Sequence, residues 1–181
     1  ALDRQPKMRP VLCLFEGVAT GAADGYARVA GKPACTLLHL GPGYGNGLAN
    51  LHNARRAGSP IINMVGDHAT YHLHYDAPLT SDALGVARPM SDWVRVSKSP
   101  QDLAHAGAEA FAMAQSYPGK IATVVVPADH AWSVGAAKVG VPVVSAPAKA
   151  PAEAVAAAAA ALQGEGPKAL FLGGRALRAD V

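Results

Sequence analysis

The stretch that decides the fold spans residues 11–53 and is VLCLFEGVATGAADGYARVAGKPACTLLHLGPGYGNGLANLHN. An apolar run at 11–15, a small-residue segment at 16–30 and a second apolar run at 34–39 predict a strand, a helix and a strand. Gly31 stands where a helix commonly ends, because glycine adopts the left-handed backbone conformation that closes the last turn. This succession predicts an α/β fold with a parallel sheet and helices on both faces.

The rest of the chain continues the alternation of strands and helices. We expect further strands at 60–65, 92–96, 120–126 and 168–172, and further helices at 48–56, 99–116 and 152–162. The glycine-rich segment 41–47 is expected to form a loop. A proline-rich, non-periodic stretch then separates two domains. We therefore predict a first domain at 1–132 that lacks its true N-terminus, a linker at 133–151, and the truncated start of a second α/β domain at 152–181.

The composition limits the classes of function. With 181 residues, half of them hydrophobic and 16% charged, the chain can bury a sizeable core. Its net charge of +3 is spread along the chain instead of gathered into a basic stripe, which argues against nucleic-acid binding. Cys13 and Cys35 lie in apolar runs and lack the C-x-x-C spacing of a redox or metal pair. Without an apolar run of about 18 residues or a signal peptide, we expect a cytoplasmic protein without a membrane span.

Two chemically active side chains follow the first two apolar runs. Glu16 comes directly after the run at 11–15, and His39 ends the run at 34–39. Because ligands of parallel α/β sheets bind beyond the carboxyl ends of strands, we expect both side chains to meet beside the loop at 41–47. Burial at a strand end would raise the pKa of Glu16. A carboxyl group of this kind can share or donate a proton near neutral pH.

Three glycines recur every four residues in the first predicted helix. Gly17, Gly21 and Gly25 lie near one face, although each costs the helix up to about 1 kcal/mol relative to alanine. The spacing indicates that another backbone packs closely on this face. Approach of a ligand or of a partner subunit is the alternative explanation.

Two further site hypotheses come from the middle of the chain. A candidate metal-ligand cluster consists of His68, His72, His74 and their neighbours Asp67 and Asp76, but His and Asp are also common in polar loops that contact substrate or a neighbouring subunit. The glycines of the segment 41–47 suggest a dinucleotide site. They do not fit the G-x-G-x-x-G spacing, because asparagine occupies position 46, and this weakens the nucleotide-binding hypothesis.

Three ordered motifs, taken together, carry a family resemblance. They are F-E-G-x-x-x-G-A-A-D-G-Y-A-R-x-x-G-K-P from Phe15, L-H-x-G-P-G-x-x-N-x-x-x-x-L-x-N-A from Leu38, and S-P-I-I-x-x-x-G-D from Ser59. Over residues 11–132 the chain resembles the pyrimidine-binding domain of thiamine-diphosphate-dependent enzymes, in the acetolactate synthase and benzoylformate decarboxylase group. The linker and the terminal β-unit resemble the start of that family's central domain.

The resemblance implies roles for individual residues. Glu16 matches the glutamate that hydrogen-bonds the pyrimidine ring of the cofactor and helps that ring to remove a proton, which is acid–base work. His39 matches a histidine of the benzoylformate decarboxylase branch that transfers protons to bound intermediates. A histidine that merely caps the strand end is the alternative. Pro42, Gly43 and Asn46 match the loop that packs on the pyrimidine.

Other positions depart from the acetolactate synthase pattern. Phe15 stands where those enzymes often have histidine, Gly17 replaces their usual glutamine, and they generally lack His39. These departures weaken the assignment of that specific reaction. The resemblance still implies an acetolactate synthase-like carboligase or decarboxylase that acts on a 2-keto acid, in branched-chain amino acid biosynthesis. It also implies a homodimer or homotetramer with the site at a subunit interface.

The cofactor set that the resemblance implies is thiamine diphosphate with Mg²⁺. The family holds Mg²⁺ through a G-D-G…N-N segment of a C-terminal domain, and this sequence has only Gly66-Asp67-His68. FAD binding has no support in this sequence. We therefore expect a fragment that carries the pyrimidine-activating glutamate, supplies no metal ligand and is inactive alone. A non-catalytic assembly or regulatory domain that retains the fold is the alternative.

Overall fold

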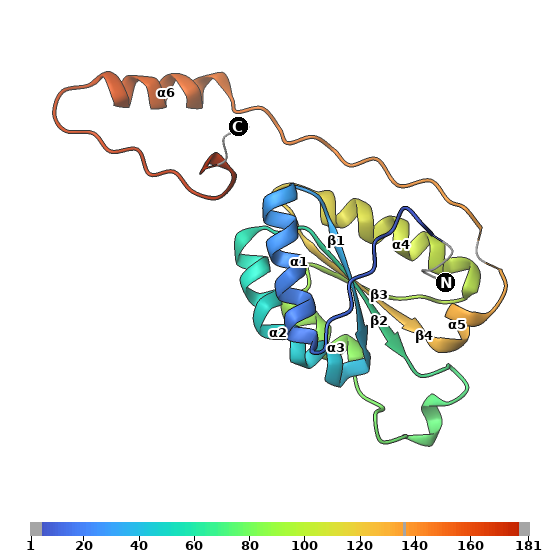
Figure 1. Ribbon diagram of the computed structural model, residues 1–181. Helices are drawn as coiled ribbons and strands as arrows, with labels where there is room; N and C mark the ends of the chain where they lie inside the picture. Colours follow the sequence, from blue (N-terminus) through green and yellow to red (C-terminus); the bar gives the residue numbers. More distant parts are fainter. Residues whose placement is uncertain (1–4, 136, 178–181) are drawn as a thin grey trace. The chain divides into compact units, whose positions relative to one another are not determined.

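The computed structural model describes residues 5–135 and 137–177, which divide into two compact units, Ala1–Val144 and Ser145–Val181. The first unit contains a four-stranded sheet in the order β1-β2-β4-β3, and every neighbouring pair is parallel. The strands are β1 (Ala34–His39), β2 (Ile61–Asp67), β3 (Trp93–Val96) and β4 (Ile121–Pro127). Its helices are α1 (Glu16–Ala30), α2 (Leu40–Ala57), α3 (Ala83–Ala87), α4 (Pro100–Gln115) and α5 (Ala128–Trp132) (Figure 1).

Short 3₁₀ turns complete the first unit, and one longer helix belongs to the second. The turns are η2 (Leu73–Tyr75) and η3 (Arg88–Met90), while the second unit contains α6 (Ala152–Gln163) and η4 (Gly174–Leu177). The division between the units follows Val144. No helix among the described residues is both long and apolar enough to cross a membrane.

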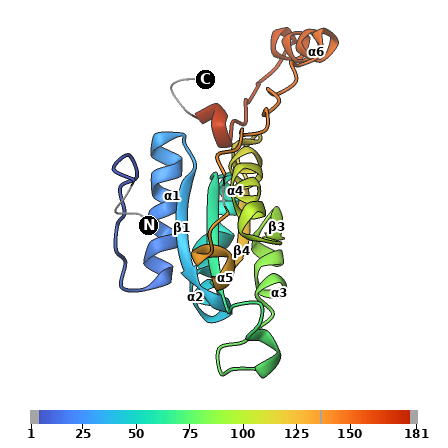
Figure 2. The same cartoon turned by 90° about the vertical axis from the view of Figure 1, so that its right-hand side faces the viewer.

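Helices cover both faces of the sheet, so the predicted fold class is confirmed (Figure 2). On one face, α1, α2 and α3 pack against apolar side chains of β1, β2 and β4. On the other face, α4 presents Ala106, Ala110 and Ala114, which are buried against β2 and β4. Their spacing of four residues places these small side chains on one stripe of the helix, so the helix axis can approach the sheet closely.

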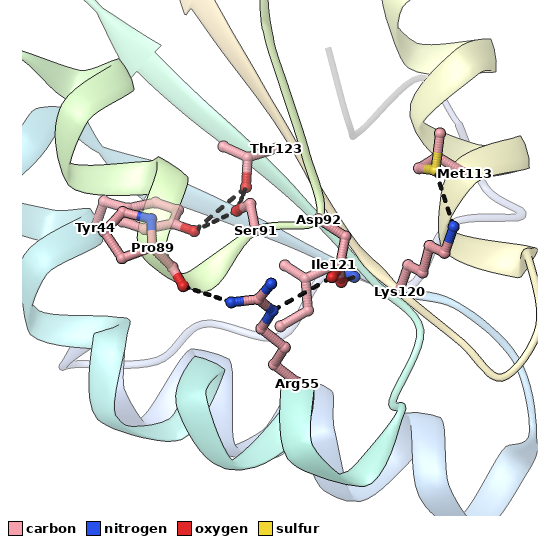
Figure 3. Close-up of polar contacts among 9 residues, drawn as sticks. All are labelled: Tyr44, Arg55, Pro89, Ser91, Asp92, Met113, Lys120, Ile121 and Thr123. Carbon is pink, nitrogen blue, oxygen red and sulfur yellow. Dashed lines mark hydrogen bonds and ion pairs between the residues drawn. The ribbon is translucent and has the colours of Figure 1, made fainter.

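A row of polar side chains crosses the sheet inside the first of these cores (Figure 3 shows its end near α2). The Thr36 hydroxyl donates to Asn63 Oδ1 (2.7 Å), and Asn63 Nδ2 donates to Thr123 Oγ1 (3.1 Å). Thr123 in turn bonds Ser91 Oγ (2.7 Å), and the Tyr44 hydroxyl contacts both Ser91 (2.8 Å) and Thr123 (3.3 Å). All five side chains are buried, so each polar group has a partner where water is excluded.

The prediction of a strand at 11–15 is wrong. These residues belong to no strand of the described sheet, and Leu12 and Leu14 are 89% and 96% exposed. The apolar run looked like a buried strand, but its backbone has no neighbouring strand with which to pair. Glu16 is therefore the first residue of α1 instead of the last residue of a strand.

The predicted loop at 41–47 is also wrong, because these residues form the first two turns of α2. Glycine disfavours an isolated helix, but here it allows close packing that outweighs the local preference. A Cβ on Gly47 would lie 2.7 Å from Thr20 Cγ2 of α1. The strand predicted at 168–172 is absent from the described part of the second unit, where Phe171 is fully exposed and no strand pairs with it.

The remaining predicted elements are present with small shifts at their ends. The helix 16–30 and the strand 34–39 match α1 and β1 residue for residue. Gly31 ends α1 with φ of 63°, in the left-handed conformation that the sequence predicted. The strands and helices predicted at 60–65, 92–96, 99–116, 120–126 and 152–162 correspond to β2, β3, α4, β4 and α6.

Candidate functional site

Glu16 lies in the first turn of α1, where its carboxylate is held by a residue of α2. Asn46 Nδ2 donates a hydrogen bond of 3.0 Å to Glu16 Oε2. This bond is the main reason that the pKa of Glu16 lies below its ordinary value of 4.5, and the residue's own backbone N–H and the nearby His39 add to the effect. The expected raised pKa is therefore wrong, because the partly exposed carboxylate gains more from these contacts than it loses by desolvation.

His39 and Gly43 lie against the same carboxylate. His39 is the last residue of β1 and directly precedes α2, and its side chain is exposed. Gly43 follows one turn later, and a Cβ built on it would lie 3.1 Å from Glu16 Oε1 and 3.2 Å from His39 Cβ. Glycine at this position therefore lets the backbone of α2 approach both side chains.

The structure thus brings four of the five candidate residues together, namely Glu16, His39, Gly43 and Asn46. Pro42, the fifth, is exposed in the first turn of α2. The meeting of an acid and an imidazole was expected from two strand ends. His39 does end β1, as predicted, whereas Glu16 comes from the start of α1 and not from a strand end.

Contacts between α1 and α2 fix this geometry. Asn50 Nδ2 donates to the Gly17 carbonyl (2.6 Å), and the buried Thr20 hydroxyl donates to the Gly47 carbonyl (3.1 Å). At Gly21 the close neighbour is a side chain and not the backbone that was predicted, because a Cβ there would lie 3.2 Å from Asn50 Nδ2. At Gly25 a Cβ would meet nothing within 4 Å.

Sequence reasoning missed three residues that hold the site in place and that are not specified by the motifs. Thr20 and Asn50 join the two helices, and Ser81 accepts a hydrogen bond from the backbone N–H of Gly41 (3.2 Å). Thr20 is buried and Asn50 is half-buried, and a single sequence does not show which polar residues of a helix face a neighbouring helix. Ser81 could have been noticed because it precedes Asp82, a residue type that often caps the start of a helix. The Asp82 carboxylate does cap α3 by accepting a hydrogen bond from the Gly85 N–H (2.8 Å).

The histidines after β2 do not gather into a metal site. The His68 and His72 rings are 5.4 Å apart, and His74 stacks on Tyr75 with ring centroids 3.8 Å apart. Across residues 5–135 and 137–177, no three side chains of His, Cys, Asp or Glu lie in a group that could hold a metal ion. The segment is instead tethered to α5, since Asp129 accepts from both the backbone N–H (2.9 Å) and the hydroxyl (2.6 Å) of Thr70.

The arrangement at Glu16 offers both hydrogen-bond donors and acceptors to a ligand. A carboxylate accepts hydrogen bonds when ionised and donates one when protonated, while a neutral imidazole can do both. Gly43 presents no side chain to the carboxylate, which Asn46 of the same helix contacts at Oε2. Together these groups can exchange hydrogen bonds with a ligand that presents both a donor and an acceptor.

Comparisons with known proteins show which family the chain resembles. Residues 1–88 match the family described as thiamine pyrophosphate enzyme, N-terminal TPP binding domain. The chain is 55% identical, over 98% of its length, to the Mycobacterium tuberculosis protein IlvX, whose name assigns it provisionally to the acetolactate synthase large subunits. It is 32% identical, over 70% of its length, to the benzoylformate decarboxylase of Pseudomonas aeruginosa.

A solved structure extends the similarity to the fold. An enzyme of Mycobacterium smegmatis, described provisionally as thiamin diphosphate-dependent, superposes with a TM-score of 0.74 and 31% sequence identity. The superposition covers 79% of this chain and 28% of that one. The chain spans 34% of the length of the Mycobacterium tuberculosis relative and 24% of the Pseudomonas aeruginosa enzyme.

Proposed function

We propose that the protein to which this chain belongs is a thiamine-diphosphate-dependent enzyme that acts on 2-keto acids. The chain carries the N-terminal TPP binding domain of thiamine pyrophosphate enzymes, and it is homologous to acetolactate synthases and benzoylformate decarboxylases. The reaction is a decarboxylation or a carboligation of the acetolactate synthase type. A carboligation of this type belongs to branched-chain amino acid biosynthesis. The identity to the Mycobacterium tuberculosis relative favours carboligation, whereas His39 favours decarboxylation.

One observation carries the proposal: Glu16 lies at the start of a helix, faces Gly43 and is bonded by Asn46. This carboxylate would hold the pyrimidine ring of thiamine diphosphate through a hydrogen bond to a ring nitrogen. Asn46 orients the carboxylate and favours its ionised form, in which Glu16 accepts a hydrogen bond from the ring. When bound, the cofactor supplies the carbon nucleophile and the electron sink that 2-keto acid chemistry requires.

His39 has a separate role in the proposal. A neutral imidazole has one nitrogen that donates a hydrogen bond and one that accepts, so it can pass a proton from one partner to another. Its place between β1 and α2 keeps it within electrostatic reach of Glu16. We assign it proton transfer to the substrate, and Pro42 and Gly43 the packing against the pyrimidine.

The remaining part of the cofactor site is proposed to come from another subunit. The diphosphate and Mg²⁺ would be held by residues outside this chain, in a homodimer or homotetramer whose site lies at the subunit interface. Exposed apolar side chains on α1 support the proposal, since Val18, Tyr26 and Val29 are 57%, 53% and 91% exposed. Sedimentation of the complete gene product at several concentrations tests it, and a monomer at micromolar concentration would contradict it.

A glutamate substitution tests the proposed function. In the complete gene product, Glu16→Gln should abolish nearly all turnover of 2-keto acids such as benzoylformate, because the amide cannot exchange a proton with the ring. Glu153→Gln on α6 is the control, since this glutamate lies in the second unit and should leave turnover unchanged. Wild-type turnover in the Glu16→Gln variant would refute the role of Glu16.

Titration calorimetry separates this proposal from the alternative of a non-catalytic assembly or regulatory domain. The complete gene product should bind thiamine diphosphate in the presence of Mg²⁺ with a measurable heat. A protein that retains the fold for assembly alone should give none. The departures at Phe15 and Gly17 from the acetolactate synthase pattern are the reason to make this measurement before any assay of activity.

A further inference from the structure

The turn between β1 and α2 has a strained backbone next to the candidate site. Leu40 follows His39 and has φ of 54°, a left-handed conformation that residues with a Cβ rarely adopt. Its side chain is 3% exposed, so it is anchored in the core. Such conformations persist where the surrounding structure over-determines them, and they concentrate at functional sites.

A serine from a distant part of the chain packs on this turn. Ser81 lies forty residues beyond Gly41, and its Oγ accepts a hydrogen bond of 3.2 Å from the Gly41 N–H. A Cβ built on Gly41 would overlap Ser81 Oγ and lie 2.8 Å from Ser81 Cβ. The backbone of the turn therefore rests directly on the serine side chain, with no room for any side chain between them.

Ser81 is itself held firmly by the start of α3. Its carbonyl accepts from the Ala83 N–H (2.9 Å), and the next residue, Asp82, caps the helix. Ala83 and Ala87 of α3 are buried in the core that α2 shares. The serine hydroxyl also satisfies an N–H group in the first turn of α2, where a helix offers no partner of its own.

We propose that Ser81 is a positioning residue for the reaction site. Its hydroxyl fixes the turn His39–Leu40–Gly41, and through this turn it sets how His39 and the Gly43 backbone face Glu16. The proposal rests on the proposed function for its chemical meaning, since it assigns Ser81 no contact with reacting atoms. The contacts that support it all lie within this chain.

The effect of such a residue follows from the geometry of the turn. His39 is two residues from the bonded Gly41 N–H, and Gly43 is two residues beyond it. A left-handed Leu40 that loses its support can relax toward a commoner conformation, and this relaxation rotates His39 relative to the helix. Small misplacements of this kind at a reaction site cost up to about a hundredfold in rate.

Nuclear magnetic resonance of Ser81→Ala in the complete gene product, labelled at histidine and glycine, tests the inference. We expect the His39 ring signals and the Gly41 amide signal to move. The matched control is Thr80→Val, which deletes the neighbouring hydroxyl. Thr80 Oγ1 is buried without a hydrogen-bond partner among the described residues, so this control should leave both signals unchanged.

A second variant covers the case in which Ser81→Ala is poorly folded. Gly41→Ala keeps the serine but drives a Cβ into it, so the His39 signals should move in this variant as well. Unchanged His39 and Gly41 signals in Ser81→Ala would overturn the inference, as would His39 signals that move equally in Thr80→Val. Calorimetry of the wild-type protein with thiamine diphosphate and Mg²⁺ judges the proposed function separately, because the signal shifts need no cofactor.

Discussion

At the scale of single residues, the hydrogen bond from Asn46 controls the charge of Glu16. This bond is the largest of the causes that lower the pKa of Glu16 below 4.5, so Asn46→Ala should raise that pKa toward its ordinary value. A carbon-13 titration of the Glu16 carboxyl group measures the change. Asn53→Ala, an exposed position on the same helix, is the control and should leave the titration as it is in the wild type.

The same bond fixes the sign of a pH effect on stability. A carboxyl group with a lowered folded-state pKa stabilises the fold above its unfolded-state pKa, and this contribution is lost as the pH falls through the folded-state value. As the pH falls below about 4.5, the free energy of unfolding of the wild type should therefore decrease, in part because of Glu16. The decrease should be smaller in Asn46→Ala. A Glu16 pKa that stays low in Asn46→Ala would show that its own helix start, not Asn46, holds the charge.

Sequence reasoning at this scale correctly placed Glu16 beside Asn46 but predicted the wrong direction for the Glu16 pKa shift. Glu16 and Asn46 stand thirty residues apart in the chain, and the motif linked them as members of one site. The direction of the pKa shift depended on whether Glu16 ended a buried strand or began a partly exposed helix. An apolar run before it fits both arrangements, so the sequence alone could not decide between them.

At the scale of elements, the close contact of α1 with α2 rests on glycine. A Cβ on Gly47 would lie 2.7 Å from Thr20 Cγ2, so Gly47→Ala should lower the free energy of unfolding by about 1–3 kcal/mol through overpacking. Gly45→Ala is the matched control on the same helix, because a Cβ on Gly45 would meet nothing within 4 Å. It should raise the free energy of unfolding by up to about 1 kcal/mol, since alanine favours helix.

Denaturant unfolding of the two variants measures this difference, and a double variant identifies its cause. Thr20→Ser removes the methyl group that Gly47→Ala would strike, while it keeps the hydroxyl that donates to the Gly47 carbonyl. The Thr20→Ser and Gly47→Ala changes should therefore be less destabilising together than the sum of their separate effects. Additive effects would mean that contact with the Thr20 methyl group is not what destabilises Gly47→Ala.

The same packing explains which elements could be predicted. The helix α1 was predictable to the residue, because Gly31 marks its end and alanine fills its interior. The first turns of α2 were not, because a run of glycines indicates a loop unless a neighbouring helix is known to pack on it. The strands expected at 11–15 and 168–172 failed for a related reason, since an apolar run does not reveal whether a strand exists to pair with it.

At the scale of the whole molecule, the row of buried polar side chains connects the sheet to α2, the helix that carries Gly43 and Asn46. Thr36, Asn63 and Thr123 are partners in register across β1, β2 and β4, and each is the third residue of its strand. Tyr44 of α2 joins the row one residue after Gly43, so the row also anchors the helix against the sheet (Figure 3). In the sequence these are single polar residues within apolar strands, and only the strand register shows that they meet.

Thr123 is the residue of this row with the most partners, which makes it the sharpest test of the row's importance. Thr123→Val keeps the shape of the side chain but removes the oxygen that accepts from Asn63 and contacts Ser91 and Tyr44. Because these buried groups lose a partner, the free energy of unfolding should fall by about 1–3 kcal/mol in denaturant titrations. Thr80→Val, the same change at a buried hydroxyl that has no partner among the described residues, should be neutral or stabilising. Equal losses in the two variants would mean that the row contributes shape and not hydrogen bonding, and that the sheet is held by its apolar faces alone.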